Sequence, residues 1–416
     1  MRFLCLWLAL SAVSAAADPE FRARREALAK ASPDGVIILF GRGEKDNEDL
    51  RSGFYQESNF YYLTGWKEPD ATLLIDPGND GIAREILFLP RHDPEREKWT
   101  GIQAAPSDPG VGEITGFEKV APRESLEAEL RASLERLPRI YTAGDAATAA
   151  LKAIAPLREV SSATLAIARL RMKKSPHEID LIQRSIDATI AAHLAAWKRV
   201  APGQYEYQIA STMLSVYQDR GCERSAYAPI VGAGPDSVFL HYSRNSRRMD
   251  GGDVLLMDVG AECAGYAADV TRTVPVSGKF SNRQHELYEV VLGAQKAAIA
   301  ATKPGMVFSR NQPHSLYQIA YDYINTHGKD LHGEPLGKYF THGLSHHVGL
   351  DVHDAWDPGL PLQEGMVITI EPGIYIPEEG IGIRIEDMVL VTAEGAKVLS
   401  AALPREIPQI EKAIAK

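Results

Sequence analysis

The segment VLLMDVGAECAGYAADVTRTV, residues 254–274, decides how the second half of the chain folds. It contains two apolar runs, with Asp258 in the first and Asp269 in the second. The pattern predicts two strands of a β-hairpin, and a turn at Cys263–Ala264 would place the aspartates directly opposite each other, with Cβ atoms about 5 Å apart. A solvated hairpin face is the alternative, but the neighbours of Asp258 are apolar. Two carboxylates so close repel each other unless a cation lies between them, so the hairpin predicts a metal site.

A second pair of acids occurs in a similar context near the carboxyl end. Apolar runs predict two neighbouring strands, 367–376 and 381–392. Glu371 and Glu386 face each other if the turn is centred on Glu378–Glu379. Arg384 precedes Glu386 by two residues and shares its face, where a guanidinium can orient a metal-binding carboxylate.

Histidines supply the third feature. Four of the chain's twelve histidines fall in one glycine-rich window: His342, His346, His347 and His353. The glycines favour a loop or a strand edge, and the window lacks the glutamate of the helical zincin motif. Because neighbours in a strand point to opposite faces, His347 is not expected to serve the same site as His346.

The composition describes an ordinary globular protein. Of the 416 residues, 45% are hydrophobic and 24% charged, and the formal net charge is -10. At about 150 residues per domain, this length predicts two or three domains. The negative charge argues against a nucleic-acid partner, and no heptad or low-complexity pattern indicates a fibrous or disordered chain.

Residues 1–17 predict a signal peptide. Arg2 precedes an uncharged run of fifteen residues, Phe3 to Ala17, which ends in small residues as at an export cleavage site. A transmembrane helix needs about 20 residues, so an uncleaved anchor is the weaker alternative. We expect a periplasmic or secreted protein with no membrane attachment after cleavage. Cys222 and Cys263 remain, either as a disulfide or as two buried thiols.

The remaining chain divides into two predicted domains. Residues 18–165 combine helices, such as Phe21–Ala31, with short buried strands, such as Val36–Phe40, and predict an α/β domain. Residues 172–416 form the second domain. Its first long helix is predicted to begin after Ser175, with Pro176 in the first turn and Glu178 completing a capping box.

A weak internal repeat indicates that the second domain has duplicated halves. Predicted helices end at Pro202–Gly203 and at Pro304–Gly305, and the tetrapeptide Tyr-Gln-Ile-Ala follows each, at 207–210 and 317–320. A chance match is the alternative, but the shared Pro-Gly context favours duplication. A cleft between two such halves is a usual place for a site.

These residues resemble the ligands of the M24 metallopeptidases, which have the pita-bread fold. The family's order and spacing of five ligands is found in Asp258, Asp269, His346, Glu371 and Glu386. The local sequences are similar to those of the aminopeptidase P branch: DVG (258–260), YAADVTRT (266–273), HGLSH (342–346), EPGIY (371–375) and GIRIED (382–387). Residues 53–101 are similar to that branch's amino-terminal domain, through FYYLTG (60–65) and EKWTG (97–101).

The resemblance implies both a fold and an activity. The fold is an α/β amino-terminal domain followed by an α+β pita-bread catalytic domain with duplicated halves. The activity is that of an Xaa-Pro aminopeptidase, which releases the first residue from peptides with proline at the second position. The family also implies a homodimer or a homotetramer.

The resemblance assigns a role to each matched ligand. Asp258 would bind one metal ion, Asp269 and Glu386 would bridge two ions, and His346 and Glu371 would each complete one site. Glu371 would also accept the proton of the attacking water. Four carboxylates and one imidazole favour Mn²⁺, with Co²⁺, Fe²⁺ or Zn²⁺ as rivals.

Four further residues receive roles from the same resemblance. His241 and His353 would hydrogen-bond the substrate and the developing oxyanion. His342 would lie beside the proline-binding pocket, together with Tyr375. The residues alone favour a core histidine on an apolar strand for His241, and only the resemblance gives it a function.

Two departures leave alternatives open. Residues 354–370 contain no arginine, whereas family members carry an arginine-containing segment there, and His347 replaces a large aromatic residue. A prolidase, which cuts Xaa-Pro dipeptides only, shares every metal ligand and is the closest alternative. Ser345 and the signal peptide favour the aminopeptidase. A non-catalytic pita-bread binding protein is the alternative from another class, and the presence of all five ligands argues against it.

Overall fold

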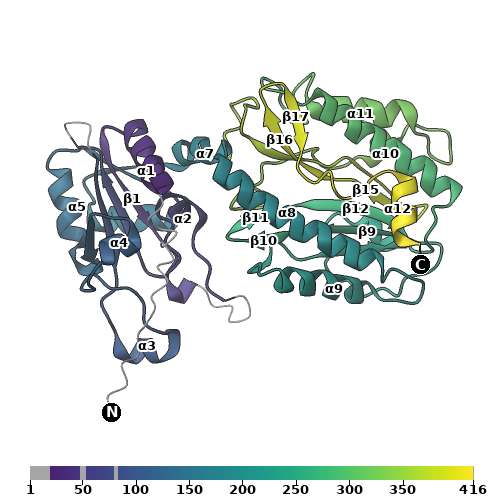
Figure 1. The fold of residues 1–416 in the computed structure, drawn as a ribbon. Helices are drawn as coiled ribbons and strands as arrows, with labels where there is room; N and C mark the ends of the chain where they lie inside the picture. Colours follow the sequence, from purple (N-terminus) through teal and green to yellow (C-terminus); the bar gives the residue numbers. More distant parts are fainter. Residues whose placement is uncertain (1–18, 47–52, 79–82, 416) are drawn as a thin grey trace, which may run out of the picture. The chain divides into compact units, whose positions relative to one another are not determined.

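The computed structural model describes residues 19–46, 53–78 and 83–415, so the predicted signal peptide lies outside the described residues. The chain forms two compact units, Met1–Leu170 and Arg171–Lys416 (Figure 1). Each unit has its own sheets and helices, and each is described separately below.

A six-stranded mixed sheet forms the centre of the amino-terminal unit. Its strand order is β4-β3-β2-β1-β5-β6, with antiparallel pairing of β1 with β2 and of β2 with β3, and parallel pairing elsewhere. The strands are β1 (Gly35–Phe40), β2 (Thr72–Asp76), β3 (Arg84–Leu89), β4 (Lys119–Pro122), β5 (Arg139–Thr142) and β6 (Glu159–Ser162). The central strands are apolar on both faces because helices cover the sheet, as is usual for an α/β domain.

The helices of this unit are short, and several of them bury apolar side chains. They are α1 (Pro19–Ala31), α2 (Ser58–Thr64), α3 (Pro94–Thr100), α4 (Val111–Thr115), α5 (Leu126–Leu134) and α6 (Asp145–Ile154). One core cluster joins Leu130 of α5 and Leu151 of α6 to Val36, Ile86 and Ile140 of the sheet. The predicted α/β domain is therefore confirmed.

The carboxy-terminal unit begins with a long helix whose start the sequence predicted. After α7 (Thr164–Met172), α8 (Pro176–Trp197) opens with the predicted capping box. The Ser175 hydroxyl accepts from the Glu178 N–H at 3.1 Å, and the Glu178 carboxylate accepts from the Ser175 N–H at 3.0 Å. Two donors that the helix itself leaves unpaired are thus satisfied.

Two helix pairs and their strands repeat along this unit. In the first half, α8 is followed by α9 (Glu206–Asp219), β8 (Ile230–Ala233), β9 (Val254–Val259) and β12 (Val270–Pro275). In the second half, α10 (Asn282–Ala301) is followed by α11 (Leu316–His327), β13 (Val367–Ile370), β16 (Asp387–Thr392) and β17 (Gly395–Val398). Each set of strands forms a three-stranded sheet. Figure 1 shows α9 and α11 at opposite edges of the unit, with strands between them. The repeated tetrapeptide lies in the first turns of α9 and α11, so the duplicated halves are confirmed.

The first acid-bearing hairpin differs from its predicted register. The turn consists of Ala264 and Gly265 with φ of 55° and 83°, and such a turn with two positive φ values fits the twist of paired strands. Asp258 therefore pairs with Thr271, and the predicted direct pairing with Asp269 was wrong. Because the pairing moved by two residues, the aspartates remain on one face as diagonal neighbours.

The hairpin is also interrupted between its two aspartates. The ladder of β9 and β12 is separated from that of β10 (Ala261–Cys263) and β11 (Tyr266–Ala267). Gly260 lies at the break, where a Cβ would approach the Ala268 carbonyl oxygen to 1.7 Å. Only glycine allows this close passage of the two backbones.

The second hairpin has the predicted register but shorter strands. The predicted strand 367–376 is divided into β13 and β14 (Gly373–Ile376) at Glu371–Pro372, because proline has no N–H for a central ladder. β15 (Ile381–Arg384) and β16 flank the facing break. Ladder pairs on either side, Ile370 with Asp387 and Gly373 with Arg384, place Glu371 opposite Glu386.

The two cysteines of the second half form a disulfide. The bond joins Cys222, in the turn after α9, to Cys263 on β10, across a sequence separation of 41 residues. It therefore ties the hairpin that carries Asp258 and Asp269 to the helix pair of the same half.

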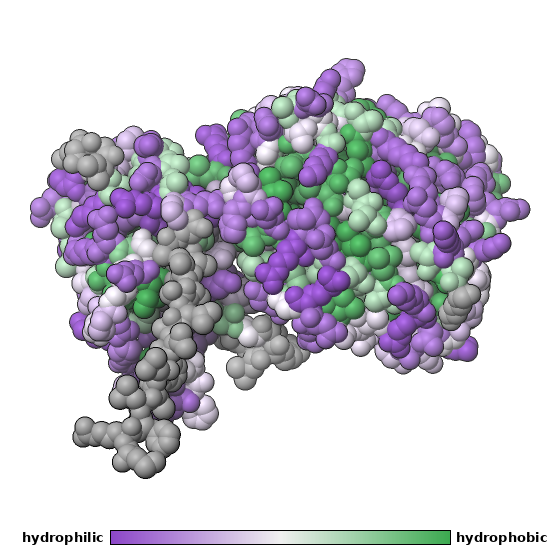
Figure 2. All heavy atoms as spheres, in the orientation of Figure 1, coloured by the Kyte–Doolittle hydropathy of each residue, from purple (hydrophilic) through white to green (hydrophobic). Residues whose placement is uncertain are grey.

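On the face seen in Figure 2, hydrophilic residues predominate on the amino-terminal unit, while hydrophobic residues gather across the middle of the carboxy-terminal unit. A helix that crosses a bilayer needs about 20 apolar residues. Within the described ranges, no helix combines the length and the hydropathy for that.

His193 predicts how stability depends on pH. It lies fully buried on α8, and burial lowers its pKa to about 3, while the unfolded chain titrates near 6.5. The unfolded state therefore binds a proton below pH 6.5 that the folded state excludes, and stability falls as pH falls. We expect urea unfolding to show that the parent loses roughly 2 kcal/mol more than His193→Gln between pH 7 and pH 5. Equal losses in the two proteins would contradict this.

Candidate metal centre

A cavity of about 450 Å³ opens between the strands of the carboxy-terminal unit. Both duplicated halves contribute to its walls. All five predicted ligands line it, although they are far apart in sequence: Asp258, Asp269, His346, Glu371 and Glu386. The fold thus brings the two hairpins and the histidine window to one place.

Distances around His346 fit a shared metal ion. Its Nε2 atom lies 3.4 Å from Asp269 Oδ2 and 3.5 Å from Glu371 Oε1. Asp269, His346 and Glu386 each offer one ligand atom within 4.8 Å of the others. Two atoms that each lie about 2.1 Å from one ion are about 3 to 3.5 Å apart, so this spacing suits metal ligands.

The tautomer of His346 also suits a metal ligand. Its Nδ1–H donates to the carbonyl oxygen of His347 at 3.1 Å. The lone pair is therefore on Nε2, the nitrogen that faces the carboxylates.

The buried carboxylates of the site need a cation to compensate their negative charge. Burial raises the pKa of Asp269 well above its ordinary value, and the charge of Asp258 raises it further. Burial and the charge of Asp269 likewise raise the pKa of Glu386 well above its ordinary value, and burial raises the pKa of Glu371. Negative charge is thus unfavourable here without compensation. Divalent cations would supply it, and the oxygen-rich donor set fits two of them.

Asp258 is the exception, because a guanidinium already compensates it. Burial by itself would raise the pKa of Asp258, but Arg384 and the Tyr227 hydroxyl lower it overall. Arg384 Nη2 donates to Asp258 Oδ2, so the carboxylate that this arginine orients is that of Asp258.

A directed hydrogen-bond chain links Arg384 to His342. Arg384 Nη1 donates to the Tyr375 hydroxyl oxygen at 2.7 Å, and that hydroxyl donates to His342 Nε2 at 2.8 Å. His342 Nδ1–H donates to the Gly343 carbonyl at 2.7 Å. Burial lowers the pKa of His342 to about 3 and raises the pKa of Tyr375 to about 12, so both are neutral near pH 7. His342 and Arg384 line the cavity, and the buried Tyr375 between them holds both in place without being one of the lining residues.

The two histidines predicted to bind the substrate both reach the cavity. His241 and His353 both line the cavity with exposed side chains, and the His353 ring lies 4.2 Å from that of His346. The core-strand interpretation of His241 was wrong. Gly234 and Pro235 begin a 3₁₀ helix, η4 (Gly234–Val238), which ends the preceding strand and leaves His241 in a turn.

His347 lies away from the cavity, as strand alternation predicted. It is buried between Phe308 and Trp356, with ring centroids 5.7 Å and 5.9 Å away. It therefore fills an aromatic cluster behind the site and offers no ligand to it.

Two hydroxyl groups at the site were not predicted. The Tyr227 hydroxyl lies 2.5 Å from Oδ1 of both Asp258 and Asp269, and Thr271 Oγ1 donates to Glu386 Oε2 at 2.7 Å. Strand alternation could have indicated Thr271, which follows Asp269 by two residues. Tyr227 lies between strands β7 (Arg224–Ser225) and β8, where no periodicity marks it.

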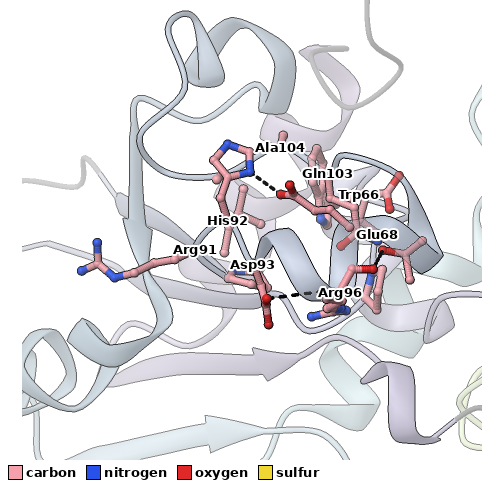
Figure 3. A pocket seen from close by; sticks show the side chains of 14 residues that line it. Trp66, Glu68, Arg91, His92, Asp93, Arg96, Gln103 and Ala104 are labelled. Carbon is pink, nitrogen blue, oxygen red and sulfur yellow. Dashed lines mark hydrogen bonds and ion pairs between the residues drawn. The ribbon is translucent and has the colours of Figure 1, made fainter.

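A histidine–carboxylate cluster in the amino-terminal unit, at the pocket that Figure 3 shows around His92, is of a different kind. His92 Nδ1 lies 2.5 Å from Glu97 Oε1, and Nε2 lies 2.7 Å from Asp108 Oδ1. Both nitrogens are used in hydrogen bonds, so neither offers a lone pair to a metal. The adjoining cavity of about 20 Å³ is the size of one water molecule.

Four acids and a histidine that converge between duplicated halves define a metallohydrolase site. Comparison with known proteins agrees with this class. The model of metallopeptidase family M24 matches residues 180–393, and that of the aminopeptidase P N-terminal domain matches residues 21–141. The chain therefore belongs to metallopeptidase family M24 and has its pita-bread architecture.

Similar proteins cover nearly the whole chain. Xaa-Pro aminopeptidase of Haemophilus influenzae is 36% identical, over 94% of this chain and 96% of its own length. Xaa-Pro aminopeptidase of Escherichia coli is 32% identical, with the same coverage. A structure described as a putative aminopeptidase P from Bacillus anthracis has a TM-score of 0.87 and 32% identity, over 95% of this chain and 98% of that one. Aminopeptidase P from E. coli with the inhibitor Pro-Leu has a TM-score of 0.85 and 29% identity, with the same coverage.

Proposed function

We propose that the protein is an Xaa-Pro aminopeptidase, which hydrolyses the bond between the first residue and a proline at the second position. The convergence of the five ligands on one cavity is the observation that carries this proposal. Relatives named Xaa-Pro aminopeptidase, 32% to 36% identical over most of the chain, support it.

The site residues fit the steps of peptide hydrolysis. Two divalent ions, when bound, polarise the water and the scissile carbonyl. Glu371 lines the cavity beside His346 and accepts the proton of the attacking water. His241 and His353 have exposed rings at the cavity and donate hydrogen bonds to the substrate carbonyl. His342, which the Tyr375 hydroxyl holds in place, forms the wall against which the proline ring packs.

The charge of the cavity favours longer peptides over dipeptides. In an Xaa-Pro dipeptide the free carboxylate is on the proline itself, and a dipeptidase needs a cation there. Among the described residues that line the cavity, Arg384 is the only lysine or arginine, and it is already paired with Asp258. In a longer peptide the proline carbonyl belongs to a neutral peptide bond, which needs no cation. The cavity therefore fits an aminopeptidase better than a prolidase.

We further propose Mn²⁺ as the resident metal, because four carboxylates and one imidazole form a mostly hard donor set. We propose export to the periplasm or the medium, which the leader-like residues 1–17 and the disulfide support. A homodimer or homotetramer is proposed as well. Trp99 and Ile102, with 90% and 82% of their surface exposed on the amino-terminal unit, support an interface there.

The first experiment compares two substrates. Residues 18–416 loaded with Mn²⁺ receive Ala-Pro and Ala-Pro-Ala side by side, with Asp258→Ala as the blank and Ala-Ala-Ala as the specificity control. We expect alanine release from Ala-Pro-Ala alone, absent from the blank. Cleavage of Ala-Pro alone would identify a prolidase. Cleavage of none of the peptides by metal-loaded protein would favour the non-catalytic binding protein.

A further inference from the structure

His353 lies on a loop that has no regular secondary structure to hold it. Residues 349–357 form neither helix nor strand, yet the loop brings His353 beside the metal ligand His346. Such loops are usually more mobile than the elements they connect. A histidine that must meet a reacting carbonyl needs a fixed position, so some other interaction has to order this loop.

A buried ion cluster meets this loop at the residue after His353. Asp354 Oδ1 accepts from Arg171 Nη2, and Asp354 Oδ2 accepts from Lys174 Nζ at 2.9 Å. The side chains of Asp354, Arg171 and Lys174 are 2%, 3% and 1% exposed. Arg171 also donates to Asp351 Oδ2 at 2.7 Å, so two cations balance two anions. The basic stretch before α8 is thus a partner of a loop about 180 residues away.

The surroundings of Asp354 are shaped for its carboxylate. A Cβ at Gly349 would lie 2.3 Å from Asp354 Oδ2, so this glycine makes the room that the ion pair uses. Burial by itself would raise the pKa of Asp354, but Lys174 and Arg171 lower it overall, so the group stays ionised. Removing one partner of such a cluster leaves an uncompensated buried charge.

The backbone of Asp354 connects this cluster to the metal ligand. The Asp354 N–H donates to the carbonyl oxygen of His347 at 2.9 Å. The same oxygen accepts from Nδ1 of His346. A shift of Asp354 would therefore move His353 and also disturb the group that fixes the His346 ring.

We infer that Asp354 is a positioning residue, whose buried ion pairs with Arg171 and Lys174 hold His353 in place over the metal centre. This inference rests on the proposed function, because it assigns His353 to substrate binding. It gives the first residues of the carboxy-terminal unit, 171–174, a part in catalysis without contact to the substrate.

A double-mutant cycle tests the inference. In the full chain loaded with Mn²⁺, Asp354→Asn should lower kcat on Ala-Pro-Ala by about 10- to 100-fold with little change in KM, since a displacement near 1 Å can cost about 10²-fold. In a His353→Ala background, the same substitution should cost several-fold less, because the residue it positions is gone and only the effect on the His346 ring remains. An equal loss in both backgrounds would overturn the inference.

Hydrogen exchange gives a readout that needs no activity. We expect amides of residues 349–357 to exchange about tenfold faster, or more, in Asp354→Asn than in the parent, with α8 unchanged. Unchanged exchange in the loop would overturn the inference. If the parent cleaves no peptide, the proposed function fails, and the exchange data still decide whether Asp354 orders the loop.

A matched control and a milder variant complete the design. Asp330 is also a buried aspartate in a loop, pairs with Lys338 Nζ at 2.7 Å, and does not line the cavity. Asp330→Asn should leave kcat and the exchange of residues 349–357 at parental values. If Asp354→Asn does not fold, Lys174→Met retains the Arg171 pair and should show the same pattern with smaller effects.

Discussion

Glu386→Gln is expected to lower kcat/KM on Ala-Pro-Ala by about 10³-fold and to remove at least one metal ion per chain. The Glu386 side chain is almost fully buried, and its Oε2 accepts from Thr271, so an amide fits the same space. The amide lacks the charge that binds a divalent ion. The loss of Lewis-acid stabilisation is several kcal/mol, and each 1.36 kcal/mol is a factor of ten. Metal content after dialysis and steady-state rates check this. A variant with two ions and parental rates would show that Glu386 is not a ligand.

The metal-free forms of the same two proteins provide a control. Without metal, Glu386→Gln is expected to raise the stability of the protein rather than to impair it. Burial and Asp269 raise the pKa of Glu386 in the folded chain, so above pH 4.5 the folded state resists a charge that the unfolded state carries freely. The cost of ionising Glu386 in the folded state destabilises the metal-free parent at high pH. This cost disappears as the pH falls toward 4.5, because the unfolded state then binds the proton as well. Metal-free Glu386→Gln should therefore be more stable than the metal-free parent at pH 8, and the difference should shrink at pH 5.

Asp387→Asn is expected to show the reverse pattern: a large loss of stability with the metal retained. Asp387 is fully buried and faces away from the cavity, where its carboxylate accepts from Arg272, Arg405, Ser400 and Gln295. Arg272, also fully buried, would keep its charge without its anion. Breaking such a pair costs about 3 to 5 kcal/mol. Urea unfolding measures the loss, and metal content of the folded variant should equal that of the parent.

An exposed ion pair serves as the control for Asp387. Arg283 and Glu286 pair at 2.9 Å, with 55% of the Glu286 side chain exposed. Glu286→Gln should leave the unfolding free energy almost unchanged, because water screens such pairs. A loss as large as that of Asp387→Asn would mean that burial does not set the cost.

Adjacent positions 386 and 387 show how much of the site the sequence predicts. Strand alternation places them on opposite faces, and the family pattern then selects Glu386 as the ligand. The acid pairs, the capping box at Ser175 and the duplicated halves follow from patterns within short segments. Such patterns depend on local geometry, which a sequence records directly.

Features that depend on contacts between distant segments were not predictable. The position of Tyr227 between Asp258 and Asp269, and the pairing of Asp354 with Arg171 and Lys174, arise only when the chain folds on itself. The error in the first hairpin has a local cause. Ala264 adopts a positive φ, which is uncommon for alanine, so its residue type did not mark the turn.

The division of ligands between the two halves has a consequence for where the protein can persist. The first half supplies Asp258 and Asp269, and the second supplies His346, Glu371 and Glu386. Ions that bind only when both halves are folded together add RT ln(1 + [M]/Kd) to the free energy of unfolding, about 2.7 kcal/mol at a hundred times Kd. The abundance of the protein should then follow the supply of metal around it. Metal starvation should remove the protein together with its activity.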